Sequence, residues 1–70
     1  MRARSFFKRG DRVKMSVVGQ ETFFPNGFLD IGEARGVIVG FNSKYPEKIQ
    51  IKRDAMNKPE YWDCRHWEKE

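Results

Sequence analysis

Two short segments of the chain alternate between polar and apolar residues, a period of two that is typical of half-buried β-strands. In the first, residues 12–16, Val13 and Met15 fall on one face and two cations on the other. In the second, residues 48–53, two isoleucines share a face and leave two lysines and a glutamine on the opposite one. Each segment therefore predicts a strand with one face in a core and one face in solvent.

A third segment, residues 35–41, is rich in β-branched residues and predicts the clearest strand of the chain. It contains Gly36 and Gly40, and glycines inside a strand mark a bend, a bulge or a close approach of another backbone. Small barrels need such points in order to curve. We therefore expect these two glycines to be where the sheet bends.

The remaining pattern consists of turns and short C-terminal strands. Residues 42–47 and 54–59 have turn composition, residues 60–63 predict a short strand, and residues 65–68 predict a closing turn or strand with Trp67 facing inward. Four to five short antiparallel strands with no long helix indicate an all-β fold, a small barrel. Closure of that barrel would remove most of the exposed strand edge.

Residues 17–34 are the least regular part of the chain. Glycines and the turn that begins at Pro25 interrupt a stretch that is otherwise apolar. A helical turn over residues 18–24 and an ordered loop fit this pattern equally well. In either case we expect Phe23 and Phe28 to cover one end of the core.

A length of 70 residues allows one small domain. The net charge of +4 is distributed unevenly: residues 1–14 carry a net +5, residues 15–59 a net +1 and residues 60–70 a net −2. The sequence therefore divides into a basic N-terminal arm, residues 1–9, and a barrel domain, residues 10–70. A basic arm of this kind attracts polyanions.

Cys64 is the only cysteine, so the chain has no disulfide. A lone thiol without a signal sequence indicates a reducing compartment, and no segment is apolar for long enough to span a bilayer. We therefore expect a cytoplasmic protein that has no contact with a membrane.

The order of these segments resembles a group of small, uncharacterised phage and prophage proteins with an SH3-like barrel. The residues that carry this resemblance are Gly10–Ser16, Arg35–Phe41, Ile49–Asp54, Lys58, Tyr61 and Trp67–Glu68. The pattern is also loosely similar to the KOW motif of ribosomal and transcription-elongation proteins. The resemblance implies an SH3-like barrel over residues 10–68, and it implies no established activity.

Candidate catalytic and metal-binding residues are few. Cys64 and His66, with Asp63 beside them, could ligate a metal, but structural zinc needs four ligands and the chain has no second cysteine or histidine. A nucleophilic site would also need an oxyanion hole and a cleft, for which a domain of this size has little room. We therefore expect no enzyme activity, no catalytic or metal site, no cofactor and no small-molecule substrate.

Binding of DNA or RNA is the function that the sequence favours. The predicted contacts are the cations of the arm and of the outer strand faces, with a tyrosine at a loop tip that could stack on a base: Arg2, Arg4, Lys8, Arg9, Arg12, Lys14, Lys48, Lys52 and Tyr45. If the strands lie side by side, the cations form a continuous basic strip. Such phosphate contacts give affinity without choice of sequence.

The alternative is a protein-interaction module, as in a phage-type adaptor or a modulator of a host protein. SH3-like barrels often bind peptides through aromatic grooves, and Tyr61 and Trp62 lie among acidic residues near the C-terminus. Tyr61 and Trp62 point in opposite directions in a strand, so one of them is expected to face solvent. The sequence leaves the ligand, the choice between DNA and RNA, and the oligomeric state open.

Overall fold

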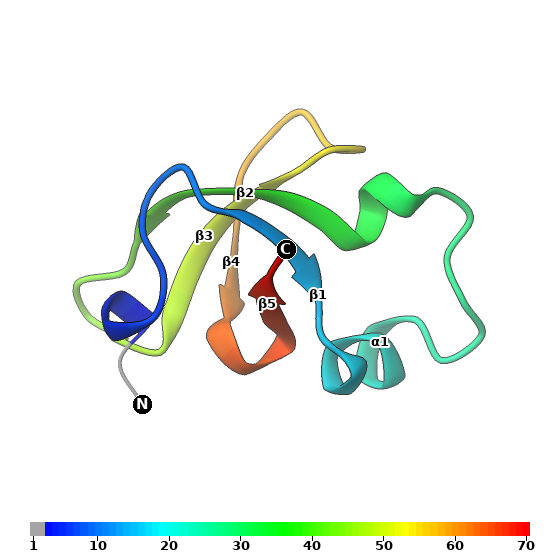
Figure 1. The fold of residues 1–70 in the computed structure, drawn as a ribbon, viewed down its shortest axis with the longest axis horizontal. Coiled ribbons are helices and arrows are strands. Elements are labelled where there is room, and N and C mark those ends of the chain that lie inside the picture. The colour runs from blue at the N-terminus through cyan, green and yellow to red at the C-terminus, as the bar shows by residue number, and fades with distance from the viewer. Residues whose placement is uncertain (1–2) are drawn as a thin grey trace.

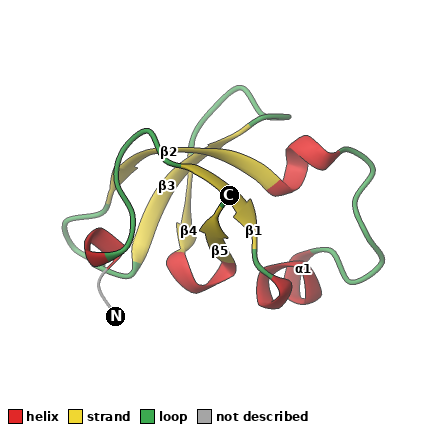
Figure 2. Ribbon diagram, in the orientation of Figure 1, coloured by secondary structure: helices red, strands yellow, loops and turns green. Residues whose placement is uncertain are grey.

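The chain folds into one five-stranded antiparallel sheet of strand order β4-β3-β2-β1-β5, seen in a computed structural model that describes residues 3–70 (Figure 1). The strands are β1 (Arg12–Met15), β2 (Arg35–Phe41), β3 (Lys48–Arg53), β4 (Glu60–Asp63) and β5 (Trp67–Lys69). One α-helix, α1 (Val17–Phe23), and three short 3-10 helices, η1 (Ala3–Ser5), η2 (Ile31–Ala34) and η3 (Cys64–His66), connect or precede them (Figure 2). The all-β, barrel-like fold of short antiparallel strands predicted from the sequence is confirmed.

The barrel is open. Strands β4 and β5 stand at the two edges of the sheet and do not pair with each other in the part of the chain that the structure describes. The single turn of η3 joins them, and the rings of Trp62 and Trp67 pack edge to face across the gap with centroids 5.5 Å apart. The expectation that closure removes the strand edges is therefore wrong, because side chains rather than backbone pairing fill this seam.

Of the features that a glycine within a strand can mark, β2 shows a close approach of another backbone at Gly36 and a register shift next to Gly40. A β-carbon at Gly36 would meet backbone and side-chain atoms of β3, with the Ile51 Cγ2 atom at 2.8 Å and the Arg53 Cα atom at 2.9 Å. Further along, the register of β2 against β3 shifts between Ile38 and Gly40, as in a β-bulge. The absence of a side chain at Gly36 thus allows the two strands to approach closely.

The core lies between the curved sheet and the segments at its ends. Residues buried in it are Ala3, Phe7, Val13, Met15, Ala34, Ile38, Ile49, Ile51, Cys64 and Trp67. Phe24, Phe28, Phe41 and Trp62 are partly buried and pack against this cluster. The alternation of β1 and β3 and the inward orientation of Trp67 are therefore confirmed.

The N-terminal segment contributes two side chains to this core. Ala3 is fully buried and Phe7 nearly so, and the Ala3 N–H donates to the Pro46 carbonyl at 2.9 Å. The N-terminal helix η1 consequently lies beside the loop between β2 and β3 at one end of the molecule (Figure 1). The boundary predicted at residue 10 does not separate this segment from the hydrophobic core.

Of the two alternatives for residues 17–34, the structure shows the helix. Ser16 caps α1 because its Oγ accepts from the Gly19 N–H at 3.2 Å and donates to the Arg65 carbonyl at 2.9 Å. Phe28 packs on the core as expected, whereas Phe23 lies against Trp62 and His66, with ring centroids at 4.9 and 5.0 Å. The helix therefore covers the β4–η3 corner.

The two glycines of β2 predict different costs of substitution. Gly36→Ala should reduce the free energy of unfolding by about 1–3 kcal/mol, because the new methyl group meets the β3 backbone. Gly40→Ala should cost less than about 1 kcal/mol, because its β-carbon meets only the flexible end of Gln50, at 2.8 Å. Urea unfolding of both variants measures this difference, and equal losses would contradict the close approach at Gly36.

Candidate nucleic-acid interface

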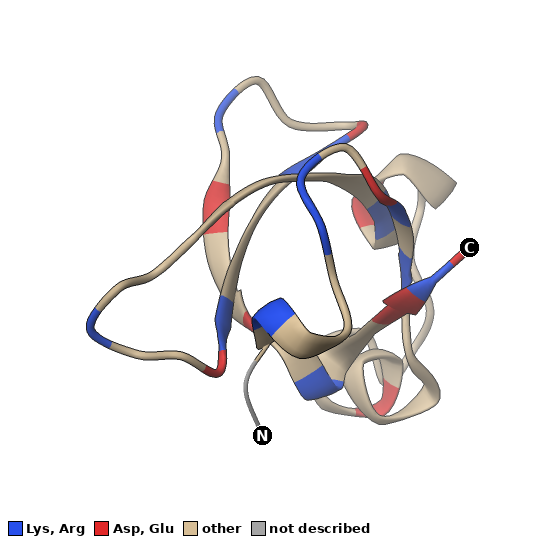
Figure 3. Ribbon diagram, turned by 60° about the vertical axis from the view of Figure 1, so that its left-hand side comes forward, with Lys and Arg blue, Asp and Glu red and all other residues tan. Residues whose placement is uncertain are grey.

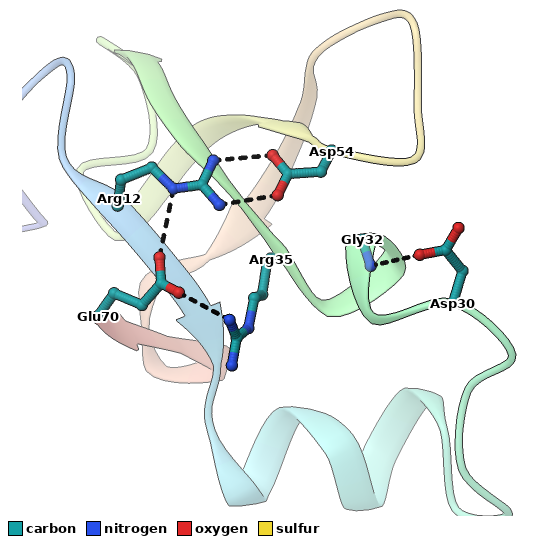
Figure 4. Close-up of polar contacts among 6 residues, drawn as sticks. All are labelled: Arg12, Asp30, Gly32, Arg35, Asp54 and Glu70. Atoms are coloured by element: carbon teal, nitrogen blue, oxygen red, sulfur yellow. Dashed lines mark hydrogen bonds and ion pairs between the residues drawn. The ribbon is translucent and has the colours of Figure 1, made fainter.

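The cations of β1 face outward as predicted, but they are occupied by ion pairs. The guanidinium of Arg12 donates from both terminal nitrogens to the carboxylate of Asp54, at 2.8 and 2.7 Å, and its Nε lies 3.3 Å from Glu70 Oε2 (Figure 4). The other oxygen of Glu70 lies 3.0 Å from Arg35 Nη1. Two arginines and two carboxylates therefore form one network on the outer face of the sheet.

The position of β5 explains why β1 is neutralised. Because β5 runs antiparallel to β1, Glu68 stands opposite Lys14 and the C-terminal residue comes to lie beside Arg12. Lys14 Nζ lies 3.9 Å from Glu68, and Lys69 Nζ lies 3.7 Å from Asp11. The acidic C-terminal segment thus offsets the basic N-terminal one, and basic and acidic segments intermingle along the ribbon (Figure 3).

These contacts shift two ionisations. The hydrogen bonds from Arg12 hold the pKa of the Asp54 carboxyl below its usual value, and the same bonds raise the pKa of Arg12. Both residues therefore remain charged and paired near neutral pH. An arginine that is already held by two carboxylates is a poor partner for phosphate, because those bonds must break first.

The other predicted cations divide into two groups. Lys48 and Lys52 lie on β3, outside the network, and take part in no ion pair within residues 3–70. Arg4, Lys8 and Arg9 are likewise outside every ion pair among the described residues and lie at the N-terminal end of the molecule. Arg2 lies outside the residues that the structure describes. The continuous strip is therefore interrupted at β1, and the predicted cations without an acidic partner among the described residues lie on β3 and in the N-terminal segment.

Two hollows at the N-terminal end share Arg4. The larger has a volume of about 400 Å³ and is lined by Arg4, Ser5, Asn42, Ser43 and Pro46. The second, of about 340 Å³, is lined by Arg4, Phe7, Lys8, Arg9 and Phe41. The Arg4 guanidinium lies over the Phe41 ring, 5.3 Å from its centroid. We call these two hollows together the N-terminal groove.

The loop between β2 and β3 forms one wall of this groove and is held in shape by its own side chain. The Asn42 Oδ1 accepts from the backbone N–H groups of Lys44 and Tyr45, at 2.9 and 3.0 Å. This Asx turn presents Tyr45 with 48% of its surface exposed and the Lys44 ammonium 5.5 Å from its ring centroid. Tyr45 is thus at an exposed loop position, as predicted.

The sequence did not single out Ser5, Asn42, Ser43 or Lys44. Their segment carries a signal, since asparagine followed by serine and lysine is turn chemistry with polar side chains. What was missing is the hydrogen bond from the Ala3 N–H to Pro46, which brings this loop beside η1. A contact between residues so far apart in the sequence cannot be predicted from the pattern of neighbouring residues.

The alternative aromatic site is only half exposed. Tyr61 is 51% exposed, whereas Trp62 is partly buried between the rings of Phe23 and Trp67 and has the Arg53 guanidinium over its face. A hollow of about 260 Å³ lies beside them, with Lys48, Glu60, Asp63 and His66 also in its lining. The expectation that one of the two aromatics faces solvent is confirmed, and the exposed one is Tyr61.

Cys64 is buried, and burial raises the pKa of its thiol. Across residues 3–70, no group of three or more histidine, cysteine, aspartate and glutamate side chains is placed to hold a metal ion. No described helix has the length and apolar character required to cross a bilayer.

No protein-family model matches the chain, and neither a curated protein nor a solved structure matches it. The resemblance to phage SH3-like proteins and to the KOW motif therefore stays a prediction. Any functional assignment has to come from the geometry of the chain itself.

The ion-pair network predicts how stability depends on pH. Because the folded-state pKa of Asp54 lies below the usual 3.8, the charged carboxylate stabilises the fold above about pH 4, and this contribution is lost as the pH falls through the folded-state pKa. Asp54→Asn should therefore lower stability at pH 7 by less than about 1 kcal/mol, since the pair is exposed, and should flatten the loss of stability below pH 4.

Urea unfolding at a series of pH values measures both effects. Glu21→Gln is the matched control, because Glu21 is exposed and takes part in no ion pair within residues 3–70. If the free energy of unfolding of the two variants depends on pH in the same way, the ion pair between Arg12 and Asp54 does not contribute to stability as predicted.

Proposed function

We propose that this domain is a non-catalytic module that binds nucleic acid through the N-terminal groove. The observation that carries the proposal is a group of three cations that take part in no ion pair within residues 3–70. Arg4 borders both hollows, and Lys8 and Arg9 border the second, whereas Arg12 is held by Asp54 and Glu70. Phosphate requires positive charge that is not already neutralised. The outer face of β1, which the sequence included in the predicted interface with the N-terminal arm, is therefore the weaker surface.

The groove has the chemistry of a phosphate site. Its first hollow offers the Arg4 guanidinium together with the hydroxyls of Ser5 and Ser43, and its second adds the side chains of Lys8 and Arg9. Guanidinium, ammonium and hydroxyl groups are the usual donors to the oxygens of a nucleic-acid backbone. Contacts of this kind supply affinity that depends on salt and hardly on sequence.

The exposed ring of Tyr45 favours a single-stranded ligand. Bases of a single strand are free to stack on an aromatic side chain, whereas those of a duplex are already stacked on each other. Tyr45 follows Ser43 and Lys44 in the loop that walls the groove, so a strand whose phosphates enter the groove passes near this ring.

We favour this function over a protein-interaction module centred on Tyr61 and Trp62. Trp62 packs against Phe23, Trp67 and Arg53, so it serves the seam of the barrel and has little surface left for a ligand. Binding hot spots of this type require an aromatic side chain that a partner can enclose.

The groove predicts a position-dependent effect of charge removal. Lys8→Gln combined with Arg9→Gln should weaken binding to a single-stranded oligonucleotide by about tenfold or more at low salt. It should also reduce the slope of log affinity against log salt by about 1.4, the loss expected for two phosphate contacts on a single strand. Fluorescence anisotropy over a salt series measures both quantities.

Lys52→Gln combined with Lys58→Gln is the matched control. It removes the same charge at the other end of β3 from the groove, and neither lysine takes part in an ion pair among residues 3–70. Equal losses in the two double variants would mean that net charge, not the groove, carries the binding. Absence of binding by the wild-type chain at low salt would overturn the proposed function itself.

Stacking on Tyr45 gives a separate prediction. Tyr45→Ala should cost about 1–3 kcal/mol of binding free energy with a single strand and leave the affinity for a duplex unchanged. Tyr61→Ala is the control, because Tyr61 is exposed to a similar extent on the edge strand β4. A loss that is equal for both tyrosines, or equal for single strand and duplex, contradicts the stacking role.

A further inference from the structure

Strand β5 is an edge of the sheet with unused backbone groups. Along residues 3–70 it pairs only with β1, in the register Val13↔Lys69, Lys14↔Glu68 and Met15↔Trp67. An edge strand presents a row of N–H and C=O groups to which another strand can be added.

The hydrogen bonds at the two ends of β5 show which of its groups point outward. The Ser16 N–H donates to the His66 carbonyl at 2.8 Å, and the Glu70 N–H donates to the Arg12 carbonyl at 3.1 Å. In an antiparallel ladder such pairs alternate, so Glu68 exchanges bonds with Lys14 and the intervening residues turn their polar groups away from β1. The outward groups are therefore the C=O of Trp67 and both backbone groups of Lys69.

An apolar hollow lies directly beside this edge. It has a volume of about 370 Å³ and is lined by Phe6, Phe7, Cys64, Arg65, Trp67, Glu68 and Lys69. The rings of Phe7 and Trp67 form its buried floor, whereas Phe6 is 54% exposed. An apolar side chain of an added strand that faces the inner side of the sheet would enter this hollow.

The charges of β5 argue against pairing with a second copy of the same strand. In a two-fold symmetric antiparallel pair, residues that stand opposite each other must lie on the same face of the sheet. The two-fold axis therefore runs between the two copies of one residue, which stand opposite each other. An axis at Glu68 sets Glu68 against Glu68, and an axis at Lys69 sets lysine against lysine and Glu68 against Glu70. Like charges directly opposite each other are destabilising, so the edge is protected against itself.

The same charges indicate what the edge accepts. Glu68 faces the outer side with half of its side chain exposed, and its ion pair with Lys14 is long, at 3.9 Å. Glu70, in contrast, is held by Arg12 and Arg35. A strand added antiparallel to β5 would set a residue opposite Glu68 in a non-hydrogen-bonded pair, where facing side chains are closest. A lysine or arginine fits there.

We propose that β5 is a docking edge for an extended segment of another protein, in which a basic residue lies opposite Glu68 and a neighbouring apolar side chain fills the hollow. Backbone pairing supplies the affinity and the alternation of basic and apolar residues supplies the selectivity, as in other cases of strand addition. The hollow beside β5 adjoins the N-terminal groove at Phe7, which lines both, but no residue of β5 lines the groove.

The probe is a capped peptide of alternating lysine and valine, about seven residues long, the length of an ordinary strand. In NMR titration it should shift the Lys69 N–H and slow its hydrogen exchange. A glutamate–valine peptide should bind at least about tenfold more weakly, and Glu68→Lys should reverse this preference. Failure of the lysine–valine peptide to bind, or binding mapped away from β5, overturns the proposal.

Two matched controls isolate the backbone pairing. Lys69→Pro removes the outward N–H of residue 69 and leaves the hydrogen bonds between β5 and β1 intact, whereas Lys69→Ala removes only the side chain. The proline variant should bind the peptide at least about tenfold more weakly than the alanine variant. On the peptide, N-methylation of the valines should abolish binding and N-methylation of the lysines should not, because only the valine N–H groups face β5.

Equal binding by the proline and alanine variants, or by the two methylated peptides, would show that charge alone attracts the peptide and would refute strand addition. Sedimentation of the wild-type chain as a dimer that Lys69→Pro dissociates would instead identify a second copy as the occupant. The oligonucleotide affinity of the Lys69 variants is a separate readout for the N-terminal groove.

Discussion

The pairing of β1 with two neighbours is the interaction on which the rest of the domain depends. On one side it pairs with β2, and on the other with β5, so that the first and last strands lie side by side in the sheet. Val13 and Met15 on its inner face are buried, and Ser16 at its end caps α1 and holds η3. In a chain this small, one strand therefore connects the sheet, the core and the helix, and few other contacts could replace it.

The same pairing decides the electrostatics. By bringing a net negative segment against a net positive one, it converts the charge asymmetry of the sequence into ion pairs on the outer face of the sheet. Exposed ion pairs contribute little to stability, but they remove cations from the set that can hold a phosphate. Among the described residues, the cations outside these ion pairs include three in η1 and the segment that follows it, Arg4, Lys8 and Arg9, and two on β3, Lys48 and Lys52.

The open seam has a second consequence. Because β4 and β5 do not pair along the described chain, the sheet keeps two edge strands. The surroundings of these two edges differ. At β4 the aromatic rings of α1 and of the strand itself pack over the corner. At β5 the outward backbone groups lie beside an apolar hollow, and the charged side chains of the strand disfavour pairing with a second copy of β5.

By itself, the sequence determined which residues form strands and which side of each strand enters the core. The alternation around Val13 and Met15, the β-branched run with Gly36 and the inward Trp67 all follow from local rules, since the period of the side chains and the turn residues are written in neighbouring positions. The helix at Val17–Phe23 was one of two alternatives because glycine inside the segment weakens its helical pattern.

The tertiary structure alone decided which charges meet. Arg12 and Asp54 are 42 residues apart, and Arg12 and Glu70 are 58 apart, so nothing local could show that the first cation of β1 is neutralised. The same is true of Ala3 and Pro46, whose hydrogen bond creates the N-terminal groove. A local pattern specifies the face on which a side chain lies, but its partner is set by strand order and register, which are properties of the whole chain.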